Sequence, residues 1–202
     1  MNRRRYIAEA LVSLGVLAFA IVAFGGGFPS VRFVSEVIRV QADGRRIHVE
    51  GLYRYRNPFP FPVSQGLSCP IWAGDGLGPV EELLVQQLPA NGEEPSALLP
   101  VRWIKGAGYF GITVPGRSKV ELRVQYTQTT TGGIGRYILT TTQPWGRPLE
   151  HGRYELELSG VRLIRSNYTL QSLGAGNYAF EKVDFMPEED WIFEIEPAGE
   201  HS

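Results

Sequence analysis

The residue types that perform chemistry in proteins are few in this chain and lie far apart. The histidines, His48, His151 and His201, have no spacing that would bring two of them onto one metal ion. No Gly-x-Ser-x-Gly nucleophile motif occurs, and a nucleophile needs a base and a group that orients that base. The single cysteine, Cys69, has no partner for an internal disulfide, and we expect it to be a small buried apolar residue. We therefore predict that the protein is not an enzyme and holds no metal or cofactor.

Three stretches look like binding or modification motifs, and each has an ordinary structural explanation. The stretch Gly74–Gly78 lacks the lysine of a phosphate-binding loop and the spacing of a dinucleotide fingerprint, so we expect a loop. The 22 residues from Glu181 carry eight acidic side chains without the loop pattern of a calcium site. Alternation in Trp191–Glu196 predicts a strand with an acidic, solvated outer face, and the alternative is contact with a basic partner. Asn167-Tyr168-Thr169 matches a glycosylation acceptor, which is a weak pattern.

Tryptophan side chains are the better candidates for a binding surface. An exposed tryptophan can stack on a sugar or anchor a protein interface. Trp145 lies in a proline-bounded loop beside Arg147, and loops carry binding residues more often than strands do. Trp72 is the second candidate. The alternative for Trp145 is a loop side chain that packs onto the core.

The stretch YRYRNPFPFPVSQGL, from Tyr53 to Leu67, begins as a strand and stops at alternating prolines. Proline cannot donate a hydrogen bond to a strand ladder, and the residue before a proline is held extended. We interpret the proline segment as a crossover between two sheets. In this interpretation Phe59 and Phe61 fill the end of the core, and the alternative is a projecting ridge that recognises a partner.

The elements that would position these residues are strands. Turn signals recur along the chain, and no segment after residue 30 shows a helical period over three turns. The segment 79–88 is compatible with either a short helix or a strand. Asp43-Gly44 predicts a tight hairpin. We expect strands near residues 33–41, 46–56, 63–69, 97–104, 109–114, 119–128, 136–142, 154–158, 162–170, 178–184 and 191–196.

Alternation in the strand 46–56 predicts which of its faces is buried. Ile47, Val49, Tyr53 and Tyr55 share the face that we expect to point inward, and Gly51 on that face indicates a bulge or a close neighbour. Together these patterns predict an all-β fold, an antiparallel β-sandwich over residues 29–202.

The N-terminus predicts a membrane anchor over residues 1–28. Arg3, Arg4 and Arg5 precede Ala10–Phe28, which has no charged residue in 19 positions, about the length of a transmembrane helix. The arginines predict a cytoplasmic N-terminus and a periplasmic or extracellular β domain. Two alternatives remain for this segment. One is a cleaved signal peptide, and the other is a pilin-like helix, which the glycines at 25–27 disfavour.

Composition narrows the class of partner. A chain of 202 residues with 43% hydrophobic residues suits one globular domain plus the anchor, and the net charge of −1 argues against nucleic acid. Gly15 and Ala18 are small residues that would let the anchor pack against other helices. We therefore expect a non-catalytic interaction or scaffold protein, an accessory subunit of a respiratory, photosynthetic or transport complex in the membrane. The alternatives are a carbohydrate-binding module that uses Trp145 or Trp72, a pilin-like filament subunit and, less favoured, an enzyme with an unrecognised site.

Deletion of residues 1–28 tests this division of the chain. We expect the remaining protein to be soluble without detergent and to fold as a mainly β domain, because the deleted segment carries the longest apolar run. Circular dichroism with thermal melting measures both properties. A mainly helical spectrum or the absence of cooperative melting would contradict the prediction.

Overall fold

Strands make up almost all of the folded chain. The computed structural model describes residues 30–80, 82–89 and 97–198. Within these residues the chain forms fourteen strands, arranged in three sheets, and one short 3-10 helix. The all-β class predicted from the sequence is confirmed. No helix in the described part is long and apolar enough to span a bilayer, and the predicted anchor with Arg3, Arg4, Arg5, Gly15 and Ala18 lies outside that part.

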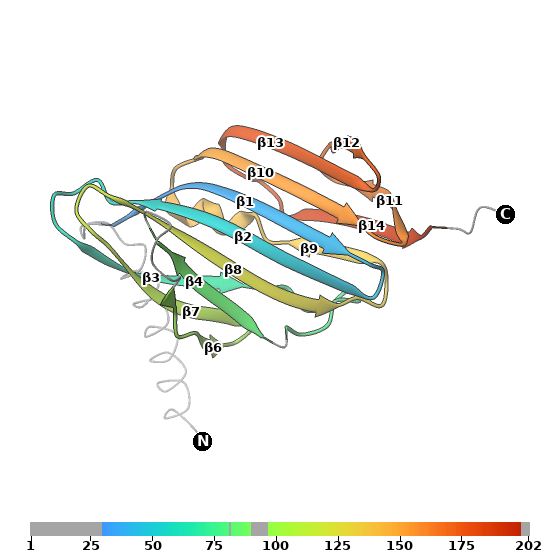
Figure 1. The fold of residues 1–202 in the computed structure, drawn as a ribbon, viewed down its shortest axis with the longest axis horizontal. Coiled ribbons are helices and arrows are strands. Elements are labelled where there is room, and N and C mark those ends of the chain that lie inside the picture. Colours follow the sequence, from blue (N-terminus) through green and yellow to red (C-terminus); the bar gives the residue numbers. More distant parts are fainter. Residues whose placement is uncertain (1–29, 81, 90–96, 199–202) are drawn as a thin grey trace, which may run out of the picture.

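The largest sheet has eight strands and one parallel pairing (Figure 1). The long strands β1 and β10 run parallel, from the Ser35–His151 pair to the Ala42–Leu158 pair. The sheet is therefore mixed, whereas the sequence predicted antiparallel pairing throughout. A parallel pair needs a long connection, and most of the described chain lies between these two strands. The spatial order is β12 (Gln171–Gly174), β13 (Asn177–Phe185), β10 (Leu149–Leu158), β1 (Arg32–Ala42), β2 (Arg46–Arg56), β8 (Lys119–Thr129), β4 (Leu83–Leu88) and β5 (Ala97–Leu98).

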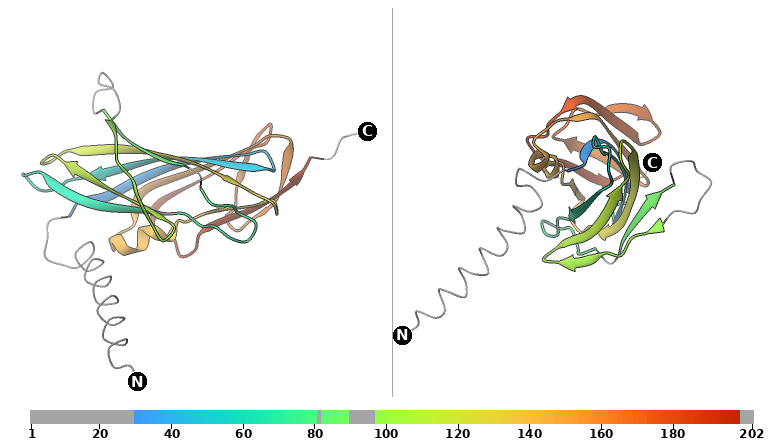
Figure 2. Two further views of the ribbon diagram at one scale, coloured as in Figure 1. Left: turned by 90° about the horizontal axis from the view of Figure 1, so that it is seen from below. Right: turned by 90° about the vertical axis from the view of Figure 1, so that its left-hand side faces the viewer.

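Two three-stranded sheets cover the apolar face of the large sheet (Figure 2). The Trp191 ring of one small sheet lies 6.2 Å from the Tyr154 ring of β10 and 5.3 Å from the Phe180 ring of β13. In the other, Gly108 lies so close to Leu83 of β4 that a side chain at 108 would clash. The core fills the space between the layers. The first sheet contains β11 (Val161–Ser166), β14 (Trp191–Pro197) and β9 (Ile134–Tyr137), and the second contains β3 (Val63–Pro70), β7 (Ala107–Val114) and β6 (Arg102–Ile104).

Several predicted elements have different bounds in the structure. The segment 79–88, for which the sequence left two alternatives, contains strand β4. The predicted strand 97–104 is two short strands, because Pro100 interrupts it. The predicted strand 136–142 is wrong beyond Tyr137, since Thr140–Trp145 form a 3-10 helix, η1. The backbone N–H and the hydroxyl of Thr140 both donate to Asp190, and this tertiary contact overrides the β propensity of the threonines.

The hairpin between β1 and β2 confirms two local predictions. Asp43 Oδ1 accepts hydrogen bonds from the N–H groups of Arg45 and Arg46, and Gly44 has the positive φ of +85° that the turn needs. On the inward face of β2, the Tyr53 ring lies directly over Gly51, where a side chain would clash with it. Gly51 therefore provides space for a close neighbour, and the register shows no bulge at this position.

The outer face of the large sheet carries a continuous line of ion pairs. The line crosses five neighbouring strands, from β13 to β8, and its side chains are partly exposed. Each exposed pair contributes little stability, about 0 to 1 kcal/mol, but together they neutralise the face and keep it compatible with water. The line runs through Glu181, Arg153, Glu155, Arg39, Glu50 and Arg123.

The proline segment connects the large sheet to a small one, as predicted, and Asn57 holds it in place. Asn57 is buried at the end of β2. Its side-chain N–H₂ donates to the carbonyl oxygens of Phe61, Val114 and Pro115, and its Oδ1 accepts from the N–H of Phe59. One amide thus satisfies backbone groups that the prolines leave without ladder partners.

Replacing Asn57 with alanine should destabilise the domain strongly. The Asn57→Ala variant leaves three carbonyls and one N–H without their partner, so we expect the free energy of unfolding to fall by about 2 to 4 kcal/mol. Urea unfolding of the two proteins measures the difference. Asn177→Ala is the matched control, because the Asn177 amide also bonds two carbonyls but in an exposed turn. Equal losses in the two variants would contradict the role of Asn57.

Candidate functional site

Trp145, the leading surface candidate from the sequence, packs against the core. It ends η1, and its ring lies 5.8 Å from the Phe33 ring and 5.7 Å from the Tyr55 ring. Trp145 is partly buried, whereas Arg147 two residues on is exposed. The predicted loop position is correct for Arg147 and wrong for Trp145, which belongs to η1. The role of both residues in partner binding stays a prediction.

The two phenylalanines of the crossover have different environments. Their rings stack on each other with centroids 5.5 Å apart. Phe59 packs against the core, whereas Phe61 is 47% exposed. The interpretation that both fill the end of the core therefore holds for Phe59 only, and Phe61 presents an apolar edge to solvent.

Trp72 is covered on one face by a cation. The Arg136 guanidinium lies 4.0 Å from the Trp72 ring centroid and also donates two hydrogen bonds to Asp190, at 3.0 and 2.7 Å. Burial raises the pKa of Asp190, while the bonds from Arg136 and Thr140 lower it, and the net pKa is below the ordinary value. Trp72 and Arg136 connect the loop after β3 to β9, so their contact ties the two small sheets together.

The acidic residues near the C-terminus have structural partners. Glu194 and Glu196 on β14 form ion pairs with Arg165 and Arg162 on β11, which confirms the predicted strand with an acidic outer face. The side chains of the described residues contain no group of three or more acidic, histidine or cysteine residues that could hold a metal ion.

The glycosylation pattern at Asn167 is engaged within the fold. The Asn167 amide nitrogen donates to the carbonyl of Asp190, and its Oδ1 accepts from the N–H of Ile192. Both polar atoms of the acceptor side chain therefore hold the start of β14, which disfavours its modification in the folded protein.

The most unusual titratable group is Glu36, which the sequence reading missed. It lies on β1 with 2% of its surface exposed. A signal was present in the sequence. Glu36 lies two residues before Ile38 and continues the period-two series of Ile38, Val40 and Ala42, so its side chain shares their inward face. An acidic residue on an apolar face contradicts the usual pattern, and it marks a position that needs a specific partner.

Burial controls the chemistry of Glu36. Desolvation raises its pKa to about 7, although the Tyr154 hydroxyl donates a hydrogen bond of 2.7 Å to Oε1 and by itself lowers the pKa. Nearby, the hydroxyls of Tyr53 and Tyr137 lie 2.6 Å apart and join β2 to β9. Burial, and then the charge of Glu36, raise the pKa of Cys69 to about 12, so its thiol stays protonated. Glu36 can exchange a proton near neutral pH, but its burial keeps it from contact with a substrate.

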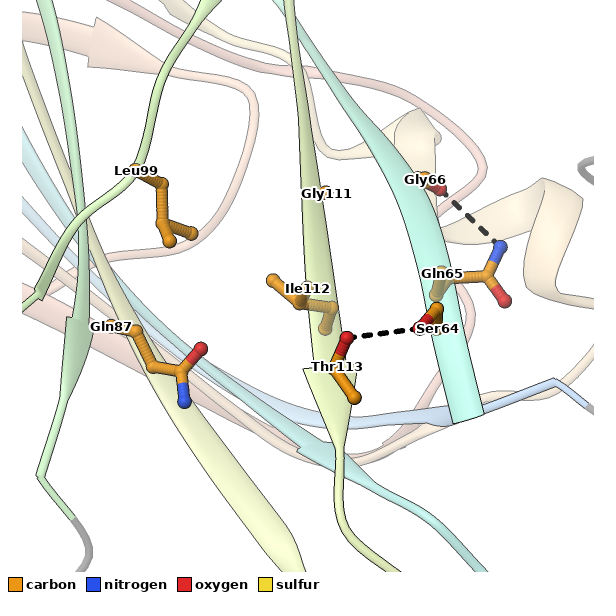
Figure 3. A pocket seen from close by; sticks show the side chains of 8 residues that line it. All are labelled: Ser64, Gln65, Gly66, Gln87, Leu99, Gly111, Ile112 and Thr113. Carbon is orange, nitrogen blue, oxygen red and sulfur yellow. Dashed lines mark hydrogen bonds between the residues drawn. The ribbon is translucent and has the colours of Figure 1, made fainter. Parts of the chain in front are cut away.

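An open hollow lies at the side of the sandwich (Figure 3). Its volume is about 610 Å³, and no charged side chain lines it. Figure 3 shows the Leu99 and Gln87 side chains on one side, with Ile112 pointing toward them from β7. The full lining is Ser64, Gln65, Gly66, Gln87, Leu99, Gly111, Ile112 and Thr113. No residue in this lining was a candidate from the sequence, because four separate stretches of the chain form it.

Comparison with known proteins identifies a related fold and no family. No protein-family model and no curated protein matches the sequence. A "putative nutrient binding protein" from Legionella pneumophila has a TM-score of 0.64 at 16% identity, over 83% of this chain and 67% of that chain. An M1 zinc metallopeptidase from Deinococcus radiodurans has a TM-score of 0.45 at 8% identity, over 83% of this chain and 43% of that chain. At these identities the first likeness shows the fold alone, and the second carries no argument.

The pKa of Glu36 predicts a stability that depends on pH. Because folding raises this pKa from 4.5 to about 7, the folded state loses stability as the pH rises through that interval. The full loss is about 3 kcal/mol, at 1.36 kcal/mol per pKa unit. Glu36→Gln keeps an oxygen for Tyr154 and removes the titration, so its free energy of unfolding should fall less over the same interval.

Urea unfolding at several pH values measures the effect. Glu188→Gln is the control, since Glu188 is an exposed glutamate, and its profile should follow that of the parent protein. Parallel profiles for Glu36→Gln and the parent protein would refute the linkage to Glu36.

Proposed function

We propose that this chain is a non-catalytic, membrane-anchored interaction protein whose β domain binds a partner outside the cytoplasm. In this proposal it is an accessory subunit of a larger membrane complex, of the respiratory, photosynthetic or transport kind. The observation that carries the proposal is an exposed apolar rim on the strands β5 to β7.

We define the apolar rim as Leu98, Trp103, Ile104 and Tyr109. Leu98 is 65% exposed and Trp103 is 44% exposed, and the other two side chains are also open to solvent. They lie on the edge strands of two sheets and on the strand beside them. The Ile104 and Tyr109 side chains share one face of the β6–β7 pair and Trp103 lies on the other, so apolar side chains are exposed on both faces of this edge. Tryptophan and tyrosine are favoured at the centres of protein interfaces.

The remaining surface features favour a protein partner over a sugar. Ion pairs cover the outer face of the large sheet. Trp145 packs on Phe33 and Tyr55, and Arg136 covers one face of Trp72, so at most one face of the Trp72 ring is left on which a sugar could stack. The support for the carbohydrate-binding alternative is correspondingly weaker.

The proposed anchor would keep the domain close to the membrane. β1 begins at Arg32, only a few residues after the end of the apolar segment at Phe28. A short tether of this kind limits the partner to proteins at the membrane surface, and the small residues Gly15 and Ala18 would let the helix pack against theirs.

Purification of the full-length protein from its native membrane tests the proposal. In mild detergent we expect the native mass to include a stoichiometric partner. The double variant Trp103→Ser, Ile104→Ser should lose that partner, because it removes both exposed apolar side chains of β6.

Ile164→Ser is the matched control, since Ile164 is 51% exposed on β11, outside the rim, and it should keep the partner. Thermal melting should show that both variants fold. A monomeric parent protein, or a partner that survives the double substitution, would refute the proposed role of the rim.

A further inference from the structure

One side of the sandwich is open where the edges of two sheets face each other. β5 is the edge strand of the large sheet, and β6 is the edge strand beside β7. β6 pairs with β7 only at residues 107–109. In the described part of the chain, residues 110–113 of β7 therefore have a strand neighbour on one side only, where they pair with β3. Successive residues of an antiparallel strand direct their backbone groups to alternate sides, so some of these groups point toward the open side.

The hollow described above adjoins this free edge. Three consecutive residues of β7, Gly111 to Thr113, line it, and Gln87 and Leu99 border it from the large sheet (Figure 3). Its volume of about 610 Å³ is within the range of ligand sites, roughly 300 to 1,000 Å³. The hollow therefore begins at the free edge and extends across β7 to residues 64–66 of β3.

The lining is neutral and rich in unused hydrogen-bonding groups. Ser64 and Thr113 bond to each other at 2.9 Å. The Gln65 amide makes one long bond, 3.3 Å, to the carbonyl of Gly66, and the Gln87 amide bonds to no other described residue. An ionic ligand would lose its hydration here without gaining an opposite charge. The lining therefore suits uncharged polar groups such as backbone amides.

A pair of glycines leaves room for close approach. Gly66 and Gly111 are directly opposite each other in the β3–β7 pairing. A Cβ at Gly66 would meet nothing within 4 Å, and one at Gly111 would meet only the Gln65 carbonyl at 4.0 Å. Neither glycine has a positive φ, so the backbone conformation does not require them. Paired glycines without a conformational role indicate a place where another backbone or a ligand approaches the sheet.

We propose that an extended, uncharged segment of a partner polypeptide binds in this hollow by adding a strand to the free edge of β7. The inference rests on the proposed function and names the site at which a partner is recognised. Strand addition gives affinity through backbone hydrogen bonds, and the Gln87 amide, across the gap from β7, would bond polar groups of the added strand.

The free edge lacks the usual protection against such pairing. Exposed edges are normally short, charged or interrupted by proline. The large sheet follows this rule, because its edge strands β12 and β5 have four and two residues. Residues 110–114 of β7, in contrast, contain no charge and no proline. No aromatic side chain lines the hollow, which disfavours a sugar as its occupant.

A random peptide library displayed on phage, panned against the full-length protein in detergent, provides the probe. We expect the selected peptides to be uncharged in their central residues. N-methylation should weaken binding at least about tenfold at alternate positions, whose N–H groups face β7, and change it little at the positions between them.

Gly111→Val tests the site itself. The added side chain enters open space and is favoured in strands, so the fold should be retained while the new bulk occupies part of the hollow beside β7. We expect peptide binding to weaken at least about tenfold. Gly132→Val is the matched control, because a Cβ at Gly132 also meets nothing within 4 Å and this glycine lies outside the hollow, and it should leave binding unchanged.

Three results would overturn the proposal: no enriched peptide, binding that tolerates N-methylation at every position, or binding that survives Gly111→Val. The proposal would also be overturned if the parent protein bound a saccharide on a glycan array and the Gly111→Val variant did not. If the rim variants release the native partner while Gly111→Val retains it, the strand site fails and the proposed function stands.

Discussion

The apolar face of the eight-stranded sheet is too wide for either three-stranded sheet to cover alone, and the rest of the structure depends on this constraint. One small sheet packs on β10 and β13 through Trp191, and the other packs on β4 through Gly108. A seam must then exist between the two covers. The Arg136 guanidinium over the Trp72 ring closes it, and the bond between the Tyr53 and Tyr137 hydroxyls holds one cover on β2 of the large sheet. The chain accordingly crosses from sheet to sheet several times, and Asn57 satisfies the backbone at one such crossing.

The same arrangement explains the buried carboxyl group. Glu36 lies on the covered face of β1, where Tyr154 is its hydrogen-bond partner. One neutral donor does not replace the hydration that a carboxylate loses, and the pKa of Glu36 rises to about 7 for this reason. Ionisation of Glu36 lowers the free energy of unfolding of the whole domain, because the core around this residue joins all three sheets.

The outer surfaces of the domain differ in how they meet water. The large sheet presents a line of paired charges, which resists association with apolar partners. The edge formed by β5, β6 and β7 differs from that face, because it exposes apolar side chains. Part of β7 there also has no strand neighbour on one side among the described residues. Both proposals for partner binding concern this edge. The rim would supply apolar contact area, and the hollow beside it would supply backbone hydrogen bonds, so one partner can use both.

The sequence by itself determined the β class, the hairpin at Asp43-Gly44 and the inward face of β2, because turn chemistry and period-two alternation are local properties. It also contained the signal for Glu36 on a buried face. Only the tertiary structure decided the parallel pairing of β1 with β10 and the replacement of a predicted strand by η1, which Asp190 holds from fifty residues away. The hollow, too, is a feature that only the tertiary structure decided. Its lining comes from four stretches that no local pattern connects. The free edge of β7 exists only because β6 begins at Arg102, which pairs with Tyr109 and leaves the later residues of β7 without a partner on that side.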